Sequence, residues 1–387
     1  IVLAEGIREW LSALKGRGMR YALASVQSGL AALGDPQQAF PAVHIAGSNG
    51  KGTTAALLAN AFTLSGVRCG LFTSPHLCYV EERIRIDGEA ISPTTFDAAL
   101  GQIRSIDQGL TFYEVTFLAA MLIFAESGVE RAVIETGLGG RLDATRCVEA
   151  DACILTSLSL EHSSVLGNTL EDIATEKAAI ARPGAPLISV RGDVDATIEG
   201  FSDSITWVEP NLSGYRQEAA DLARACAESL GRTDVAMRVD LERLNWPGRH
   251  QVLYHKGTQL HLEGAHNPCG VARFVAETDP STFDAIVLGT TPQEDLSSCF
   301  SPLLEAKGNA AVVLTVPQGG RHPGVGLPEL MAAFSPVPIH AMHPDPMQAL
   351  EIALRSGPRV LIIGSLYLIG NILAEIDPPG SILKPTQ

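Results

Sequence analysis

The stretch that decides the fold is residues 43–54, which read VHIAGSNGKGTT. Residues 43–46 predict a buried strand, and residues 53–65 predict a helix that ends before Gly66. Glycines between a strand and a helix let backbone N–H groups converge on phosphate oxygens, and the helix N-terminus adds a partial positive charge. Lys51 adds a full charge, and a threonine hydroxyl can serve phosphate or magnesium.

The segment therefore predicts a nucleotide phosphate loop. Its predicted phosphate-binding residues are Gly47, Ser48, Asn49, Gly50, Lys51, Gly52, Thr53 and Thr54. The usual Walker spacing places the hydroxyl residue directly after the lysine, whereas Gly52 intervenes here. The alternative is a plain glycine turn, but three glycines, a lysine and two threonines coincide in the required context.

Outward from this loop, short apolar runs alternate with helical stretches, which is typical of a parallel sheet with crossover helices. We expect strands at 70–73, 132–135, 153–156, 259–262, 285–288, 311–314 and 360–363, and helices at 115–127 and 217–230. Thr169 is the expected N-cap of a further helix, with Asp172 in capping-box position. Residues 191–210 show weak periodicity and are expected to be irregular.

The chain is long enough for two domains. We predict an α/β protein in which residues 1–245 form a parallel-sheet, mononucleotide-binding domain with the phosphate loop. Residues 246–387 are predicted to form a smaller Rossmann-like domain.

Composition and charge exclude several classes of protein. The net charge of −15 argues against a nucleic-acid partner, which would require a basic surface. The sequence contains no run of about 20 apolar residues, so we expect no membrane-spanning helix. The seven cysteines include no C-x-x-C pair, so free thiols in a reducing cytoplasm fit better than disulfides or a zinc site.

Several motifs together resemble those of one enzyme family. The loop GSNGKGT resembles that of the Mur ligase superfamily, and residues 44–54 are similar to its folylpolyglutamate synthase/dihydrofolate synthase branch. Further family-like segments follow in order: TSPHL (73–77) with ERI (82–84), ETGLGGRLDAT (135–145), His162 with LG (166–167) and EKA (176–178), GAHNP (264–268), and GSLY (364–367). The resemblance covers most of the chain.

The resemblance implies an ATP-dependent ligase that joins L-glutamate to the carboxylate of dihydropteroate or of a folate through an acyl phosphate. It also implies a cytoplasmic monomer that uses two magnesium sites. Because two anions must meet, cations must neutralise charge, and docking both substrates removes an encounter entropy of about 7–11 kcal/mol.

The resemblance also assigns metal ligands. It makes Ser74, Glu135 and His162 ligands of one magnesium ion, and Lys177, commonly carbamylated in the family, a ligand of the second. Without the resemblance, Glu135 could cap a loop, Ser74 could be a turn residue and His162 a loop histidine. Lys177 beside Glu176 could equally form a solvated ion-pair face.

Other roles come from the second domain and the acceptor side. By resemblance, Arg249 reaches the nucleotide phosphates when the domains close, and Lys51, Lys177, Arg249 and His266 carry catalysis. Glu263, His266 and Asn267 join the nucleotide site, while Arg83 contacts the pterin side, and Ser365 and Tyr367 contact glutamate. The alternatives are a hinge role for Arg249 and a helix N-cap role for Asn267.

Some positions depart from the family pattern. Glu161 and Glu263 replace aspartates, Glu81 and Arg146 replace asparagines, and Ala220 stands where an asparagine near adenine is expected. These departures leave two alternatives open: a divergent Mur-type ligase for another carboxylate, and a nucleotide-binding homologue that has lost catalysis.

Overall fold

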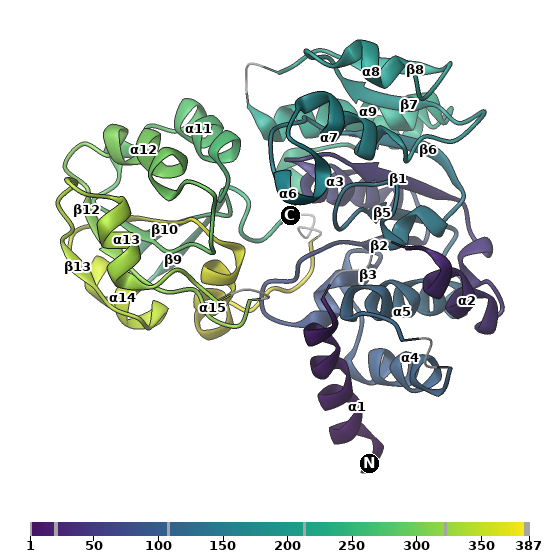
Figure 1. The fold of residues 1–387 in the computed structure, drawn as a ribbon, viewed down its shortest axis with the longest axis horizontal. Coiled ribbons are helices and arrows are strands. Elements are labelled where there is room, and N and C mark those ends of the chain that lie inside the picture. Colours follow the sequence, from purple (N-terminus) through teal and green to yellow (C-terminus); the bar gives the residue numbers. More distant parts are fainter. Residues whose placement is uncertain (1, 19–21, 107–108, 212–213, 321–322, 383–387) are drawn as a thin grey trace. The chain divides into compact units, whose positions relative to one another are not determined.

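The computed structural model describes residues 2–18, 22–106, 109–211, 214–320 and 323–382 (Figure 1). The chain divides into two compact units. The first contains the residues up to Pro75 and Glu81–Leu244, together with Ser381 and Ile382. The second contains His76–Val80 and Asn245–Gly380. A single cut near residue 245 is therefore too simple, because one short segment on each side belongs with the other unit.

The first unit is an α/β structure, drawn from purple to teal in Figure 1. Its helices are α1 (Val2–Ala13), α2 (Ala24–Ala32), α3 (Lys51–Leu64), α4 (Pro93–Ser105), α5 (Phe112–Glu126), α6 (Ser163–Leu166), α7 (Leu170–Ala178), α8 (Asp195–Glu199), α9 (Tyr215–Ser229) and α10 (Thr233–Ala236). Short 3₁₀ turns are η1 (Leu14–Arg17), η2 (Pro36–Gln38), η3 (Val80–Arg83), η4 (Ala144–Cys147) and η5 (Leu241–Arg243).

The described residues of this unit form an eight-stranded sheet in the order β4-β3-β2-β5-β1-β6-β7-β8. Its strands are β1 (Ala42–Ala46), β2 (Cys69–Phe72), β3 (Ile84–Ile86), β4 (Glu89–Ala90), β5 (Arg131–Glu135), β6 (Ala150–Leu155), β7 (Leu187–Val190) and β8 (Ile205–Val208). The neighbouring strands β2, β5, β1, β6, β7 and β8 pair in parallel, whereas β3 pairs antiparallel with β2 and β4 pairs antiparallel with β3. Every residue of β1 is buried, as expected for a central strand covered on both faces.

This strand order places several candidate site residues at the same edge of the sheet. β1 lies between β5 and β6, and β2 lies beyond β5. The carboxyl ends of these parallel strands lead into Gly47, Thr136, Thr156 and Thr73. Ligands of open α/β sheets bind at that edge, so the topology brings together four segments that are far apart in the sequence.

The second unit is also an α/β structure, drawn in green and yellow in Figure 1. Its described strands form a sheet in the order β13-β12-β11-β14-β10-β9, parallel except for β9. The strands are β9 (Gln251–His255), β10 (Thr258–Glu263), β11 (Ala285–Leu288), β12 (Ala311–Leu314), β13 (Ala341–Met342) and β14 (Arg359–Ile363). The helices are α11 (Pro268–Glu277), α12 (Leu296–Ala306), α13 (Leu327–Ala333), α14 (Pro346–Ala353) and α15 (Leu366–Ile376), with the turn η6 (Pro280–Thr282).

The predicted fold class is confirmed, and each expected strand is present within a few residues. The expectation for residues 191–210 is wrong, because α8 and the edge strand β8 lie there. Both are short, and the residues of β8 are only partly buried, so they leave little apolar periodicity in the sequence.

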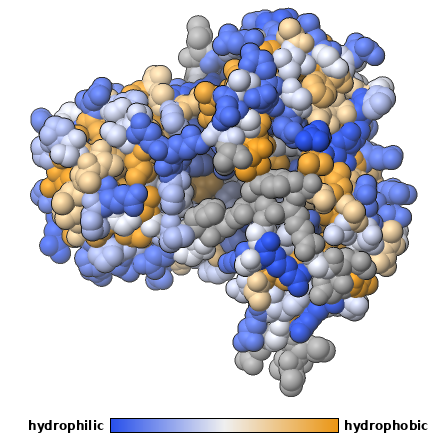
Figure 2. All heavy atoms as spheres, viewed as in Figure 1, coloured by the Kyte–Doolittle hydropathy of each residue, from blue (hydrophilic) through white to orange (hydrophobic). Residues whose placement is uncertain are grey.

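The surface mixes polar and apolar side chains over the face drawn in Figure 2. Within the described residues, no helix has both the length and the apolar character needed to cross a bilayer.

Candidate nucleotide and metal site

The phosphate loop begins at Gly47, where only glycine fits. Its φ angle is 144°. A Cβ atom on this residue would lie 1.8 Å from Thr156 Oγ1, because the chain after β6 passes directly beside the loop. Gly50 has a φ of 85° and stands at the N-cap of α3 without a side-chain cap. The N–H groups of the first turn of α3 are therefore not capped by a side chain, as an anion site requires.

Ser48 and Asn49 fasten the loop to the segment after β6. The Ser48 amide donates to Ser157 O at 3.0 Å, and its hydroxyl donates to Ser159 O at 3.1 Å. The Asn49 side chain donates to Ser159 Oγ at 3.3 Å. These contacts use the Ser48 hydroxyl inside the protein, where it helps to hold the loop in shape.

Lys51 bends back over the loop. Its Nζ donates to the carbonyl oxygens of Gly47 at 2.9 Å and Ser48 at 3.3 Å. The predicted charge is thus held above the loop, where a phosphate would need it.

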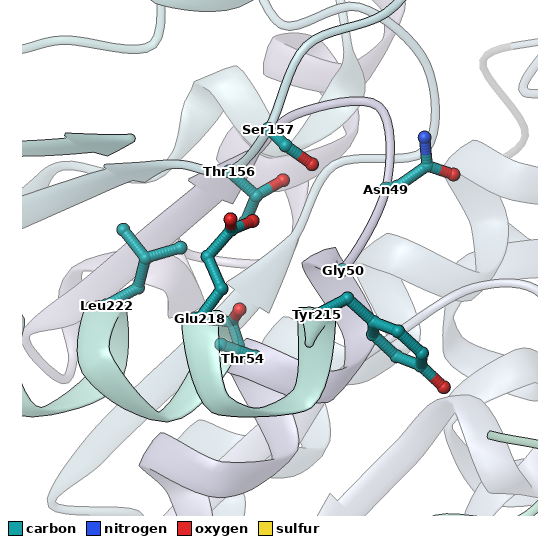
Figure 3. A pocket seen from close by; sticks show the side chains of 9 residues that line it. Asn49, Gly50, Thr54, Thr156, Ser157, Tyr215, Glu218 and Leu222 are labelled. Carbon is teal, nitrogen blue, oxygen red and sulfur yellow. The ribbon is translucent and has the colours of Figure 1, made fainter. Parts of the chain in front are cut away.

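A small pocket lies between the loop and α9, lined by Asn49, Gly50, Thr54, Thr156, Ser157, Tyr215, Glu218, Ala219 and Leu222 (Figure 3). Within the described part of the chain, the hydroxyls of Thr53, Thr54 and Thr156 are buried without a hydrogen-bond partner. Such orphaned hydroxyls fit a site that is completed by a polar ligand. Ala220, where the family pattern expects an asparagine, is fully buried and does not line this pocket.

Lys177 is the most deeply buried charge near the loop. Its side chain is 1% exposed, and its Nζ lies 2.8 Å from Gly47 O and 2.8 Å from Glu161 Oε1. Burial lowers the pKa of Lys177 to about 8, although the carboxylate of Glu161 opposes that shift. Burial would raise the pKa of Glu161, but the charges of Lys177 and Lys51 outweigh it and lower that pKa to about 2. The solvated-face alternative for Lys177 is therefore wrong.

Local structure explains why Lys177 points inward. Thr169 and Asp172 form the predicted capping box that starts α7. At the other end, the carbonyl oxygens of Glu176 and Lys177 would lie 2.9 Å from a Cβ on Gly140, so only glycine permits this close packing. Arg141 Nη2 contacts Glu176 Oε1 at 2.7 Å. Glu176 thus forms an ion pair at the surface, whereas the side chain of Lys177 points into the interior.

The predicted metal ligands lie at or after the carboxyl ends of β2, β5 and β6, and on α7. The Ser74 amide donates to Glu135 Oε2 at 3.0 Å, which joins the ends of β2 and β5. His162 has an exposed side chain and a φ of 49°, and its charge helps to lower the pKa of the neighbouring Glu161. Among the residues that the structure describes, no three His, Cys, Asp or Glu side chains gather into a ready metal cluster. The donors fit Mg²⁺, which commonly takes one or two carboxylates together with phosphate oxygens and water.

Tyr113 connects the acceptor-side candidates. Burial, Asp143 and Glu135 raise its pKa well above the ordinary value, and Arg83 opposes this shift. Arg83 is itself buried and stacks on Phe112, 5.2 Å from the ring centroid. Arg83 and Glu135 therefore both lie within electrostatic reach of one half-buried tyrosine.

The other predicted residues belong to the second unit. The Arg249 guanidinium covers Gly264 so closely that a Cβ there would lie 1.9 Å from Nη1. His266 Nδ1 lies 2.7 Å from Gly264 O. Glu263 accepts N–H groups of His250 and Ala265, both at 3.0 Å, so its carboxylate braces these loops. Arg249, Glu263 and His266 are thus brought together.

Two helix caps account for further candidates. Asn267 is the N-cap of α11 and accepts from the Gly270 amide at 2.7 Å, which is the alternative considered for it. Ser365 is buried and caps α15 by accepting from the Tyr367 amide at 3.1 Å. Their predicted ligand contacts, like those of Arg249, Glu263 and His266, stay predictions.

Sequence reasoning missed several partners. Glu161 was noted only as a departure, yet it forms the ion pair with Lys177. Asp143, Tyr113 and His44 were not considered as site residues, although they form a buried network behind Glu135. The available signal was a histidine in the otherwise apolar strand β1, since buried polar groups need partners.

Comparisons with known proteins agree with this geometry. The sequence model of the Mur ligase middle domain matches residues 45–188, which include the loop, Glu135 and Lys177. The fold and this match thus define a protein with a Mur ligase middle domain. The dihydrofolate synthase/folylpolyglutamate synthase of Escherichia coli is 30% identical over 68% of this chain and 71% of its own length. The chain belongs to the dihydrofolate synthase/folylpolyglutamate synthase family.

Full-length likeness varies among relatives. The Bacillus subtilis dihydrofolate synthase/folylpolyglutamate synthase is 28% identical over 94% of this chain and 97% of its own length. A probable bifunctional folylpolyglutamate synthase/dihydropteroate synthase of Haloferax volcanii is 31% identical over 90% of this chain. The chain spans 47% of that longer protein.

Solved structures show the same fold. Folylpolyglutamate synthase of Mycobacterium tuberculosis, described in complex with ADP and AMPPCP, has a TM-score of 0.84 at 24% identity, covering 98% of this chain and 99% of that chain. The Yersinia pestis bifunctional enzyme, described with AMPPNP and a manganese ion, has a TM-score of 0.82 at 25% identity, covering 95% of this chain and 97% of that chain.

Proposed function

We propose that this chain uses ATP to join L-glutamate to the carboxylate of dihydropteroate, of a folate, or of both. The observation that carries the proposal is the convergence of Lys51 and Lys177 on the Gly47 carbonyl, with Glu161 beside Lys177. Two cations and an uncapped helix N-terminus suit a polyphosphate, and the family relatives carry the matching activity names.

The reaction has two balanced steps. The terminal phosphoryl group of ATP moves to an oxygen of the acceptor carboxylate, and ADP leaves. The glutamate amine then attacks the acyl carbon, loses a proton, and expels inorganic phosphate to leave an amide. In both steps the loop amides and Lys51 hold negative charge, which is where preorganised donors contribute most to catalysis.

Magnesium fits the first unit as a bound cation. Glu135 and Ser74 would hold one ion, with His162 as a further ligand, and the metal would supply charge neutralisation on the phosphates. A second ion would lie at Lys177, modified or not. A carbamate there would supply an anionic oxygen ligand, and it forms from the neutral amine. The lowered pKa of Lys177, about 8, enlarges that neutral fraction near pH 7.5.

Carbamylation of Lys177 has its own test. Protein incubated with ¹³C-bicarbonate and magnesium gives a carbamate carbon signal in NMR, and Lys177→Met abolishes it. An identical signal in Lys177→Met would assign the carbamate to another amine. We also propose that the partners of this protein are small molecules, that it is a monomer, and that it works in the cytoplasm.

A substrate panel tests the function. Purified protein is incubated with ATP, magnesium and glutamate, and with dihydropteroate or a reduced folate as acceptor. We expect ADP release that depends on the acceptor, and a product heavier by one glutamyl residue. Product from one acceptor alone assigns the activity to it.

Two outcomes separate the alternatives. Nucleotide binding without turnover on any acceptor would support a homologue that has lost catalysis. Turnover with a different carboxylate, such as a peptidoglycan precursor, and none with either pterin, would support a divergent Mur-type ligase.

A further inference from the structure

A buried hydrogen-bond chain runs from β1 to the turn after β5. His44 on β1 is fully buried, and its Nε2 lies 2.8 Å from Thr145 Oγ1. Thr145, also fully buried, contacts Asp143 Oδ1 through its hydroxyl at 2.5 Å and its amide at 3.0 Å. His44 and Thr145 are 101 residues apart in the sequence, so their hydrogen bond joins two separate segments of the fold.

The donors on Asp143 fix the direction of these bonds. Oδ2 accepts the amides of Gly137 at 3.0 Å and Leu138 at 2.9 Å, and Oδ1 accepts the Tyr113 hydroxyl at 3.1 Å. Burial raises the pKa of Asp143, but all its hydrogen bonds from Thr145, Leu138 and Tyr113 favour the carboxylate. In each of these bonds an Asp143 oxygen is the acceptor.

The tautomer of His44 follows. Because the Thr145 hydroxyl gives its hydrogen to Asp143, its oxygen accepts from His44, so the proton of the ring lies on Nε2. Nδ1 has no hydrogen-bond partner among the described residues. Burial, helped by Arg146, lowers the pKa of His44 to about 3, which keeps the ring neutral.

At its other end, this series of hydrogen bonds holds the turn that follows Glu135. Gly137 and Leu138 follow Glu135 by two and three residues. A Cβ on Gly137 would lie 2.5 Å from Tyr113 Cζ, so the tyrosine ring packs closely against this turn. The Thr136 amide donates to Ile45 O at 2.9 Å, next to His44. The turn is thus fixed from three sides.

We propose that His44 is a positioning residue that, through Thr145 and the Asp143 carboxylate, fixes the turn at 136–138 and thereby the side chain of Glu135. The inference rests on the proposed function only in its last link, from Glu135 to the metal. His44 acts on Glu135 in this proposal only through the hydrogen bonds that join it to Thr145 and Thr145 to Asp143.

Two variants of His44 form a matched pair. The amide nitrogen of His44→Gln can reach the position of Nε2 and donate to Thr145. The shorter side chain of His44→Asn reaches only the position of Nδ1. Thr145→Ser and Thr145→Val form a second pair, which keeps or removes the hydroxyl if the His44 variants fold poorly.

Hydrogen exchange of metal-free protein gives the first readout. In His44→Asn and Thr145→Val, the Gly137 and Leu138 amides exchange about tenfold faster than in the parent chain, as expected for one lost hydrogen bond. His44→Gln and Thr145→Ser exchange at the parent rate. Unchanged exchange in both disruptive variants would overturn the proposal.

Turnover gives the second readout. The same disruptive variants need about tenfold more magnesium for half-maximal ADP release, while KM for glutamate is unchanged and His44→Gln restores the parent value. Faster exchange with unchanged magnesium dependence would overturn the link to Glu135. If the parent chain makes no product, the proposed function fails, and the exchange data still decide whether His44 fixes the turn.

Discussion

The ammonium nitrogen of Lys177 lies 2.8 Å from the carbonyl oxygen of Gly47, although 130 residues separate the two in the sequence. This contact ties helix α7 to the first residue of the phosphate loop. The same nitrogen meets Glu161 at 2.8 Å, so one buried lysine joins the loop, α7 and the segment after β6. A change in any one of these three segments is therefore expected to alter the position of Lys177 relative to the other two.

Removal of Lys51 is expected to abolish most turnover and leave the fold intact. Lys51→Ala should lower kcat/KM for ATP by about 10²–10³-fold, because the loop loses its charge at the developing negative oxygens. Lys256→Ala is the matched control, since its side chain is 59% exposed and forms a surface ion pair with Glu351. ADP release and circular dichroism measure both variants; near-parent turnover in Lys51→Ala would contradict the assignment.

The Lys177–Glu161 pair is expected to show strong coupling. Lys177→Met leaves a buried carboxylate unpaired and should destabilise the first unit by about 3–5 kcal/mol. Adding Glu161→Gln removes that unpaired charge and should restore much of the stability, while activity stays lost. Urea unfolding of the single and double variants measures the coupling, and additive effects would mean that the two side chains do not interact.

Gly140→Ala should displace α7. The new Cβ would meet the carbonyl oxygens of Glu176 and Lys177, so we expect a loss of about 1–3 kcal/mol and a fall in kcat. Gly101→Ala is the control, because this glycine lies inside α4 with open space around its Cβ position. That variant should be neutral or stabilising by up to about 1 kcal/mol. Equal effects at both positions would argue against close packing of α7.

Acid is expected to weaken the second unit through His261. Burial, with help from His250 and Arg359, lowers the pKa of His261 to about 4. Below the ordinary pKa of 6.5 the unfolded chain binds the extra proton, so the unfolding free energy falls as pH decreases from 6.5 to 4. One such histidine accounts for about 2 kcal/mol between pH 6.5 and 5.

His261→Phe should flatten this part of the pH dependence, since the ring packs against Phe274 and Phe283 and a phenyl group cannot titrate. Hydrogen exchange of the β10 amides at several pH values reports the second unit alone. The same slope in parent and variant would show that His261 does not titrate as described.

The sequence predicted the sheet strands and the loop because buried parallel strands are continuous apolar runs with glycine-rich ends. It also predicted the Thr169 capping box, which depends only on neighbouring residues. It could not predict that Lys177 is buried, because this depends on Gly140, which lets α7 approach. Nor could it place His44 and Asp143 together, since their link passes through Thr145 across two separate segments.

The most direct test of the central claim follows an oxygen atom. An acceptor labelled with ¹⁸O in its carboxylate is incubated with the protein, ATP, magnesium and glutamate, and the inorganic phosphate is analysed by mass spectrometry. Transfer of the terminal phosphoryl group to the carboxylate predicts one ¹⁸O atom in each phosphate released with an amide. Amide product accompanied by unlabelled phosphate would contradict the acyl phosphate, and with it the account of the loop given above.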